Sequence, residues 1–219
     1  RTYRLIQNVS SNGTCFTIIA NNVTLDGQGY KITYGIDGSS DQYGVYVNGT
    51  NQTKIKNLLI EDINKSGVNQ YAMYFLYSYN STISNNTIRV NESGSGIYMN
   101  NGGSNLITNL SIISAMDGIN LFYSGNTILS NLNIDTNKSS AEGINLDTSS
   151  YINISNVTIT TSGTDATGIA LAVNEYSVNM SRINITTLGN ANGISVQFSS
   201  NNSLDNAIIK SGKNGILIA

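Results

Sequence analysis

Two acidic residues are the first candidates for chemistry in this sequence. Asp117 and Glu142 each come directly before a glycine that is followed by isoleucine, asparagine and leucine. If this pattern marks successive turns of a repeating structure, the two carboxyl groups lie on neighbouring strands, about 4.8 Å apart. A pair of carboxyl groups, one protonated and one ionised, is what glycoside hydrolysis requires. Two solvated acids on a turn are the alternative interpretation.

Three tyrosines form a second candidate site. Tyr46, Tyr74 and Tyr98 each occupy the variable position between two apolar residues, which points away from a core in a strand. Three rings should therefore stack on an outer face, where aromatic surfaces can bind sugars or a partner. Stacked residues of one kind also stabilise neighbouring strands by about 0.2 to 1 kcal/mol per pair, so a purely structural role stays open.

The acceptor pattern for N-glycosylation, Asn-x-Ser/Thr, occurs sixteen times. With 34 asparagines and 48 serines and threonines in 219 residues, chance gives about seven or eight. Part of the excess comes from the repeat itself, which places a serine or threonine two positions after an asparagine. We expect surface N-glycosylation in a chain that passes through a secretory pathway. The predicted acceptors are Asn8, Asn12, Asn22, Asn48, Asn51, Asn64, Asn80, Asn91, Asn137, Asn153, Asn179, Asn184 and Asn201.

Metal and cofactor chemistry has little support in the sequence. Histidine is absent and Cys15 is the single cysteine, which leaves no transition-metal set and no nucleophile–base pair. Asp37 and Asp41 share a Gly-Ser loop whose oxygens could hold Ca²⁺, but two acids are too few for a calcium site. We therefore expect no cofactor apart from covalent glycans, and no catalytic residues.

The element that must position these residues is a short repeat. Glycine, apolar, variable, apolar recurs at Gly96, Gly118, Gly143, Gly168 and Gly193, with looser copies before and after. A period of 22 to 25 residues with strand-like alternation predicts a solenoid, in which each turn buries its apolar side only against its neighbours. Strands of three to five residues between Asn, Ser, Gly and Thr turns, without a helical period, predict an all-β fold.

A second motif fixes the position of a corner within each turn. It reads apolar, x, Asn, apolar, x, apolar, as in residues 55–60 and 107–112. Asparagine suits a corner because it tolerates the left-handed backbone conformation. We expect these side chains to lie inside and form a hydrogen-bonded ladder, which would leave Asn85, Asn109 and Asn156 without sugar and turn Arg182 outward. The predicted ladder residues are Asn57, Asn85, Asn109, Asn131, Asn156 and Asn206.

Length and composition limit the remaining possibilities. The repeat covers nearly all 219 residues, which predicts one domain over 1–219, in a mature or excised segment. Charged residues make up 11% of the chain, the net charge is −2, and lysine and arginine are scattered singly, so nothing would follow a nucleic-acid backbone. No stretch approaches the roughly 20 apolar residues of a membrane span.

The repeat resembles that of right-handed parallel β-helix proteins of the pectate-lyase-like superfamily. Residues 22–27 (NVTLDG) and 43–47 (YGVYV) are similar to the carbohydrate-binding and sugar-hydrolase repeat modules related to NosD. The resemblance implies a single-stranded right-handed parallel β-helix of about nine coils, of a type frequent in secreted and cell-surface proteins. It does not specify an activity, because this scaffold carries lyases, hydrolases, adhesins and spacers. The histidine and basic residues of the family's enzymes are missing here.

The sequence thus predicts an extracellular, N-glycosylated structural β-helix rather than an enzyme. It would serve as a cell-surface stalk, an adhesin-like element or a fibril subunit, with copies stacking head to tail through uncovered strand edges. The alternative is a carbohydrate-binding or polysaccharide-degrading module. The expected partners are accordingly further copies of the chain or glycans.

Overall fold

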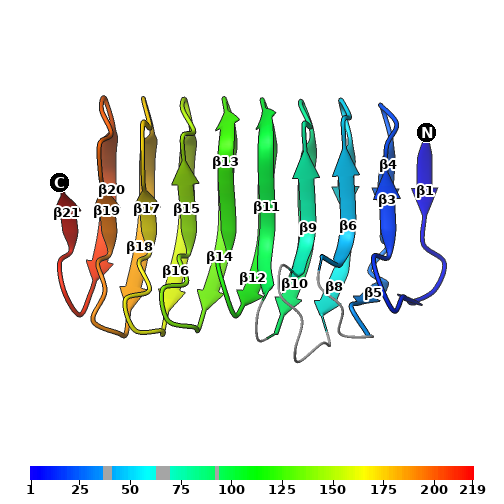
Figure 1. Cartoon of the computed structure of the whole chain (residues 1–219), viewed down its shortest axis with the longest axis horizontal. Coiled ribbons are helices and arrows are strands. Elements are labelled where there is room, and N and C mark those ends of the chain that lie inside the picture. The colour runs from blue at the N-terminus through cyan, green and yellow to red at the C-terminus, as the bar shows by residue number, and fades with distance from the viewer. Residues whose placement is uncertain (37–40, 63–69, 92–93) are drawn as a thin grey trace.

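The protein is a long stack of short parallel strands. The computed structural model describes residues 1–36, 41–62, 70–91 and 94–219. Every regular element among them is a β-strand, so the described part of the chain contains no helix that could span a membrane. The strands lie side by side along one axis, with the two termini at opposite ends of the stack (Figure 1).

The first sheet has nine strands that follow one another along the stack axis, and three short strands lie beside them. Its main path is β1 (Thr2–Arg4), β4 (Thr24–Asp26), β7 (Lys54–Lys56), β10 (Thr82–Val90), β12 (Leu106–Ser114), β14 (Ile128–Thr136), β16 (Asn153–Thr161), β18 (Asn179–Thr187) and β20 (Ser203–Lys210). The strands off this path are β2 (Val9–Ser10), β5 (Lys31–Tyr34) and β8 (Leu59–Asp62).

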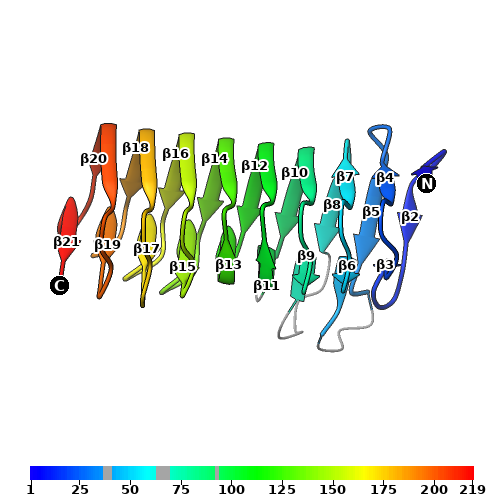
Figure 2. The same ribbon diagram turned by 90° about the horizontal axis from the view of Figure 1, so that it is seen from above.

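The second sheet has nine strands in the same direction of travel. They are β3 (Phe16–Ile18), β6 (Tyr43–Asn48), β9 (Gln70–Leu76), β11 (Gly94–Gly103), β13 (Ile119–Gly125), β15 (Ile144–Asp147), β17 (Ile169–Leu171), β19 (Ile194–Val196) and β21 (Ile216–Ile218). Figure 2 shows the two sheets as two rows, with β10, β12 and β14 in one and β9, β11 and β13 in the other.

The chain passes alternately through the two sheets and advances by one strand per turn. All pairings between neighbouring turns are parallel, and about eight turns are completed. The expected all-β parallel solenoid is therefore confirmed. Since each strand pairs only with the equivalent strand of the turn before and after, one turn can be described for all.

The predicted corner exists, and its backbone is left-handed as expected. Asn57, Asn85, Asn109, Asn131, Asn156, Arg182 and Asn206 all have φ between 53° and 56°. Strands such as β10 and β12 bend at this residue, and the register between neighbouring turns skips it. Asparagine is common here because a left-handed residue costs other L-amino acids about 1 to 2 kcal/mol.

The prediction that these corner side chains are buried is wrong. Asn57 is half-buried, and Asn85, Asn109, Asn131, Asn156 and Asn206 are exposed, as is Arg182. The left-handed residue adds a second outward-facing position in a row, as in a β-bulge, so the apolar residues on both sides of it keep facing inward.

On the outside, part of a ladder does form between these corner side chains. Asn156 Nδ2 donates to Asn131 Oδ1 at 2.7 Å, Asn85 Nδ2 donates to Asn57 Oδ1 at 3.4 Å, and Asn57 Nδ2 donates to Asp26 Oδ1 at 2.9 Å. The Asn156–Asn131 and Asn85–Asn57 bonds are exposed to water, and the three bonds do not link all six residues, so the corner contributes to stability mainly through its backbone conformation.

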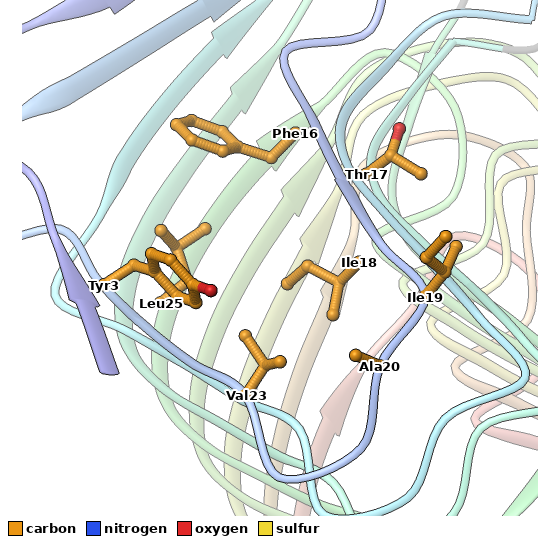
Figure 3. A pocket seen from close by; sticks show the side chains of 8 residues that line it. All are labelled: Tyr3, Phe16, Thr17, Ile18, Ile19, Ala20, Val23 and Leu25. Atoms are coloured by element: carbon orange, nitrogen blue, oxygen red, sulfur yellow. The ribbon is translucent and has the colours of Figure 1, made fainter. Parts of the chain in front are cut away.

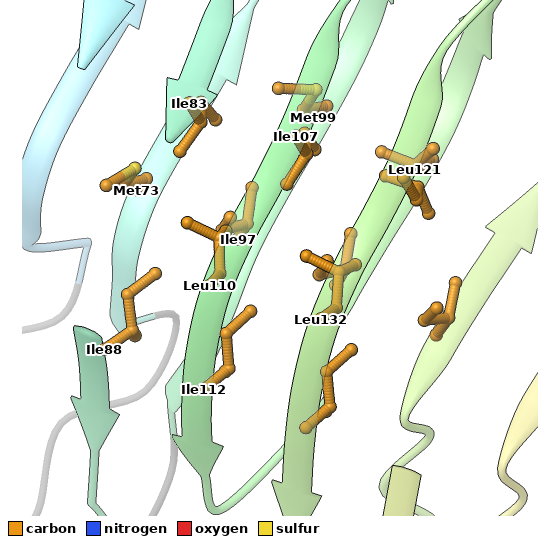
Figure 4. Close-up of a cluster of buried hydrophobic side chains, with 14 of the residues drawn as sticks. Met73, Ile83, Ile88, Ile97, Met99, Ile107, Leu110, Ile112, Leu121 and Leu132 are labelled. Atoms are coloured by element: carbon orange, nitrogen blue, oxygen red, sulfur yellow. The ribbon is translucent and has the colours of Figure 1, made fainter. Parts of the chain in front are cut away.

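The core consists of inward-facing isoleucine, leucine and valine side chains that stack in columns along the axis (Figure 4). Ile83, Ile107, Leu129 and Ile154, for example, are in register on successive strands and almost fully buried. The repeat glycine is needed where the second sheet approaches this core. A Cβ added to Gly168 would lie 2.5 Å from Cγ2 of Ile185 and 2.6 Å from the carbonyl oxygen of Gly193.

Buried hydroxyl groups close the turn between the two sheets. Thr136, Thr161 and Thr187 are in register at the ends of β14, β16 and β18, and all three are buried. Their hydroxyls donate to the carbonyl oxygens of Ala141, Ala166 and Ala191 in the turns that follow. These polar groups therefore stabilise the turns without leaving an unpaired atom inside.

Candidate functional site

Tyrosines gather on the outer face of the second sheet. Tyr46 on β6, Tyr74 on β9 and Tyr98 on β11 are in register on three successive turns. Their ring centroids are 5.5 Å apart between Tyr46 and Tyr74, and 5.3 Å apart between Tyr74 and Tyr98. All three are half-buried and face outward, in the column that the sequence predicts.

Two further tyrosines belong to the same cluster and were not predicted. Tyr43 and Tyr71 are in register on β6 and β9, with ring centroids 6.0 Å apart, and Tyr71 lies 5.0 Å from Tyr98. The signal that could have found them is their position directly before Gly44 and Ala72, which is the phase of Asp117 and Glu142 in later turns. We call the five residues Tyr43, Tyr46, Tyr71, Tyr74 and Tyr98 the tyrosine face.

The rings of the tyrosine face shield one another from water. Burial raises the pKa of Tyr43 and of Tyr71 to about 12, and it also raises the pKa of Tyr74 and Tyr98. The phenols are therefore neutral at physiological pH, and each can donate as well as accept a hydrogen bond.

The carboxyl pair predicted from the sequence lies on the same outer face. Ser95 is in register with Tyr71 on the next turn. When this register is extended to the two turns after that, the equivalent positions are Asp117 and Glu142. The backbone N–H of Glu142 donates to Asp117 Oδ1 at 2.9 Å, and Asn120 Nδ2 donates to Asp117 Oδ2 at 3.1 Å. The two acids are thus neighbours, as expected, and they extend the tyrosine face along the stack.

The pKa values of both carboxyl groups are raised, which favours a proton on the pair. Burial, the charge of Asp117 and a hydrogen bond to Asp117 raise the pKa of Glu142 to about 8, and burial raises the pKa of Asp117. The pair can therefore hold and release one proton near neutral pH.

A buried acid was missed by the sequence analysis. Glu175 is 1% exposed, and within the described structure neither carboxylate oxygen accepts a hydrogen bond of good geometry. Burial raises its pKa to about 7, although the nearby backbone amides of Thr148 and Ser149 oppose the shift. Its position in the chain, before Tyr176 in an irregular turn, gives no sequence signal of burial.

The remaining predicted polar sites are distributed as follows. Asp37 lies outside the described residues, and Asp41 is exposed with a left-handed backbone. Within the described ranges, no group of three or more acidic, histidine or cysteine side chains could hold a metal ion. Cys15 is half-buried, and burial raises the pKa of its thiol to about 11.

Most of the acceptor asparagines lie on the surface away from the tyrosine face. Asn48 is the exception, because it follows Tyr46 by two residues on β6 and so faces the same side. Asn64 is outside the described residues, and Asn48, at the end of β6, is half-buried. The other predicted acceptors are exposed, on the first sheet or on the corners and turns beside it. Asn85, Asn109 and Asn156 are exposed as well, so the reason for excluding sugar from them does not hold.

A separate cavity of about 290 Å³ opens at the N-terminal end of the stack (Figure 3). Its walls are largely apolar and come from the first turns. They carry no carboxyl or basic group, so this cavity offers no catalytic or ion-binding chemistry. The residues that line it are Tyr3, Phe16, Thr17, Ile18, Ile19, Ala20, Val23 and Leu25.

The comparison with protein families agrees with the architecture. Residues 43–219 match the family described as the right-handed β-helix region. The chain therefore belongs to the right-handed β-helix family, a class whose members share a scaffold rather than one activity. No curated protein matches the chain.

Several solved structures are distantly similar. The A-module of mannuronan C-5 epimerase AlgE6 from Azotobacter vinelandii is 15% identical, with a TM-score of 0.39, over 100% of this chain and 88% of that one. A catalytic-domain variant of a GH87 α-1,3-glucanase in complex with nigerose is 12% identical, with a TM-score of 0.34, over 99% of this chain and 60% of that one. A tailspike protein of E. coli bacteriophage HK620, in complex with a pentasaccharide, is 9% identical, with a TM-score of 0.34, over 94% of this chain and 47% of that one. Similarities of this size carry no functional information.

Proposed function

We propose that this β-helix binds carbohydrate, and that the ligand lies across the tyrosine face. The observation that carries the proposal is the set of five half-buried tyrosines on three successive turns, with ring centroids 5.0 to 6.0 Å apart. Sugar rings stack on aromatic surfaces, and the neutral phenols supply hydrogen bonds to hydroxyl groups.

The scaffold suits this role because it holds the rings without a loop. Tyr46, Tyr74 and Tyr98 stand on paired strands, so their spacing is set by the backbone hydrogen bonds of the sheet. Sites on regular elements are held more precisely than sites on loops. Asn120 and Asn145 continue the same column and offer amide groups to a longer chain.

The proposal is for binding rather than hydrolysis. The carboxyl groups of Asp117 and Glu142 belong to one polar network, in which Asp117 Oδ1 accepts a hydrogen bond from the backbone N–H of Glu142 and Asp117 Oδ2 accepts one from Asn120 Nδ2. We assign them to the polar continuation of the face.

A glycan array followed by calorimetry with the best ligand tests this function. Tyr74→Ala removes the ring that contacts Tyr43, Tyr46 and Tyr98, and should weaken binding at least about tenfold. Tyr151→Ala is the matched control, because Tyr151 is an exposed tyrosine whose ring lies beside that of Tyr176, outside the tyrosine face. Equal loss in both variants, or no glycan bound by the parent protein, would overturn the proposal.

A second role is supported by the exposed acceptor asparagines. We propose that the protein is extracellular or on a cell surface, carries N-glycans, and serves there as a structural element. Glycopeptide mass spectrometry of the native protein tests this, with sugar expected on exposed sites such as Asn153 and Asn179. Unmodified peptides at all exposed acceptors would contradict it. Head-to-tail association of copies stays a prediction, for which sedimentation analysis is the test.

A further inference from the structure

The strands of the sheet that carries the tyrosine face bear acidic but no basic side chains. None of the nine strands of the second sheet contains lysine or arginine. The basic residues that stand on strands belong to the first sheet, where several are paired with acids: Lys31 and Arg89 with Glu61, and Lys56 with Asp26. A ligand on the tyrosine face therefore meets no positive charge from any strand of that sheet.

Acidic residues, in contrast, act directly on the tyrosine rings. After burial, which is the main cause, the charge of Asp41 contributes to the raised pKa of Tyr43, and the charge of Asp117 contributes to that of Tyr71. The charge of Asp147 contributes likewise to the raised pKa of Tyr98. These carboxylates come from three different turns and so flank the face along its length.

Asp147 stands in a column beside the rings. It is in register with Phe122, which is in register with Asn100 on the strand that carries Tyr98. Its carboxylate is half-exposed, and Thr148 Oγ1 donates to Asp147 Oδ1 at 2.9 Å, which holds it in place. One of its oxygens thus remains for a ligand.

Aromatic faces bordered by carboxylates attract cations in two ways: through the ring quadrupole and through the negative charge of the carboxylates. They repel carboxylate and sulfate groups for the same reason. We propose that the tyrosine face selects glycans that carry protonated amino groups and rejects glycans built from uronic acids. This inference rests on the proposed carbohydrate-binding function and names the class of glycan.

The test is calorimetry of the whole chain with three oligosaccharides of equal length: a glucosamine oligomer, its N-acetylated counterpart and a uronate oligomer. At low salt and about pH 6, the amino form should bind at least about threefold more tightly than the N-acetylated form. The uronate should bind most weakly. Added salt should reduce the preference for the amino form, because screening weakens exposed charges.

Asp147→Asn should lower the ratio of amino to N-acetyl affinity, since the amide keeps the hydrogen bond from Thr148 but has no charge. Asp205→Asn, which removes an exposed carboxylate on the first sheet, is the control and should leave the ratio unchanged. Equal affinity for the amino and N-acetylated forms, or tighter binding of the uronate, would overturn the inference but leave the binding function standing. Failure of all three sugars to bind, while another glycan of the array binds, would overturn the inference alone, and binding of no glycan at all would overturn both.

Discussion

At the scale of single residues, Glu142 should make stability depend on pH. Its pKa in the folded protein is raised from 4.5 to about 8, so the folded state holds the proton more tightly than the unfolded chain does. The resulting stabilisation is complete below about pH 4.5 and is lost as the pH rises through about 8. Glu142→Gln keeps a neutral donor to Asp117 and should remove the part of this loss that falls above pH 7.

Urea denaturation of the parent protein and of Glu142→Gln between pH 7 and pH 9 measures this effect. Asp205→Asn serves again as a control for a surface carboxylate. Parallel declines in the free energy of unfolding for all three proteins would show that Glu142 is not held in a proton-sharing pair.

Glu175 should act in the same direction but in a lower pH window. Its folded-state pKa of about 7 lies above the ordinary value of 4.5, so its protonation favours the folded state. This contribution to the free energy of unfolding is complete below about pH 4.5 and is lost between about pH 4.5 and pH 7. Above pH 7 the buried carboxylate is charged without a good partner, which costs up to about 3 kcal/mol. Glu175→Gln should therefore be more stable than the parent at pH 8 and similar to it at pH 4. A variant less stable than the parent at pH 8 would mean that the carboxylate has a partner.

At the scale of elements, the corner between two strands makes a conformational prediction. Asn131 is exposed and has φ of 55°, so Asn131→Ala should lose about 1 kcal/mol of stability, whereas Asn131→Gly should lose much less. Both variants lose the hydrogen bond from Asn156, so the difference between them isolates the backbone term. Thermal unfolding of the two variants is the measurement. Equal stability would show that the left-handed conformation is not maintained in solution.

The same elements show what the sequence can and cannot predict. The turns were predictable because apolar residues at fixed phase determine which side chains face inward, and the corner was predictable because left-handed backbone favours asparagine. The direction of the corner side chain was not, because it depends on whether the extra residue is added on the inner or the outer side. Tyr46, Tyr74 and Tyr98 were predictable from alternation, whereas Tyr43 and Tyr71 required the register between turns. Glu175 lies in a turn whose sequence has no apolar–polar alternation, so its burial could not be predicted from the sequence.

At the scale of the whole molecule, the two sheets present different surfaces. The exposed acceptor asparagines lie on the first sheet and the corners and turns beside it, while the five residues of the tyrosine face lie on strands of the second sheet. Sugars on these exposed acceptors should therefore leave ligand binding unaffected. In an Asn48→Gln variant, which removes the acceptor beside Tyr46, enzymatic deglycosylation should not change affinity.

A glycan placed on the second sheet should have the opposite effect. Phe122→Thr creates an acceptor at Asn120, which is in register with Tyr98 on the neighbouring strand. Expressed in a glycosylating host, this variant should lose binding, and enzymatic deglycosylation should restore it. Retained affinity with the sugar demonstrably attached at Asn120 would argue against a ligand on this face.

A crystal structure of the protein with its best-binding oligosaccharide tests the central claim most directly. We predict sugar rings over Tyr46, Tyr74 and Tyr98, with the chain running along the stack toward Asn120 and Asn145. A ligand bound elsewhere, with the five tyrosine rings free of it, would contradict the account.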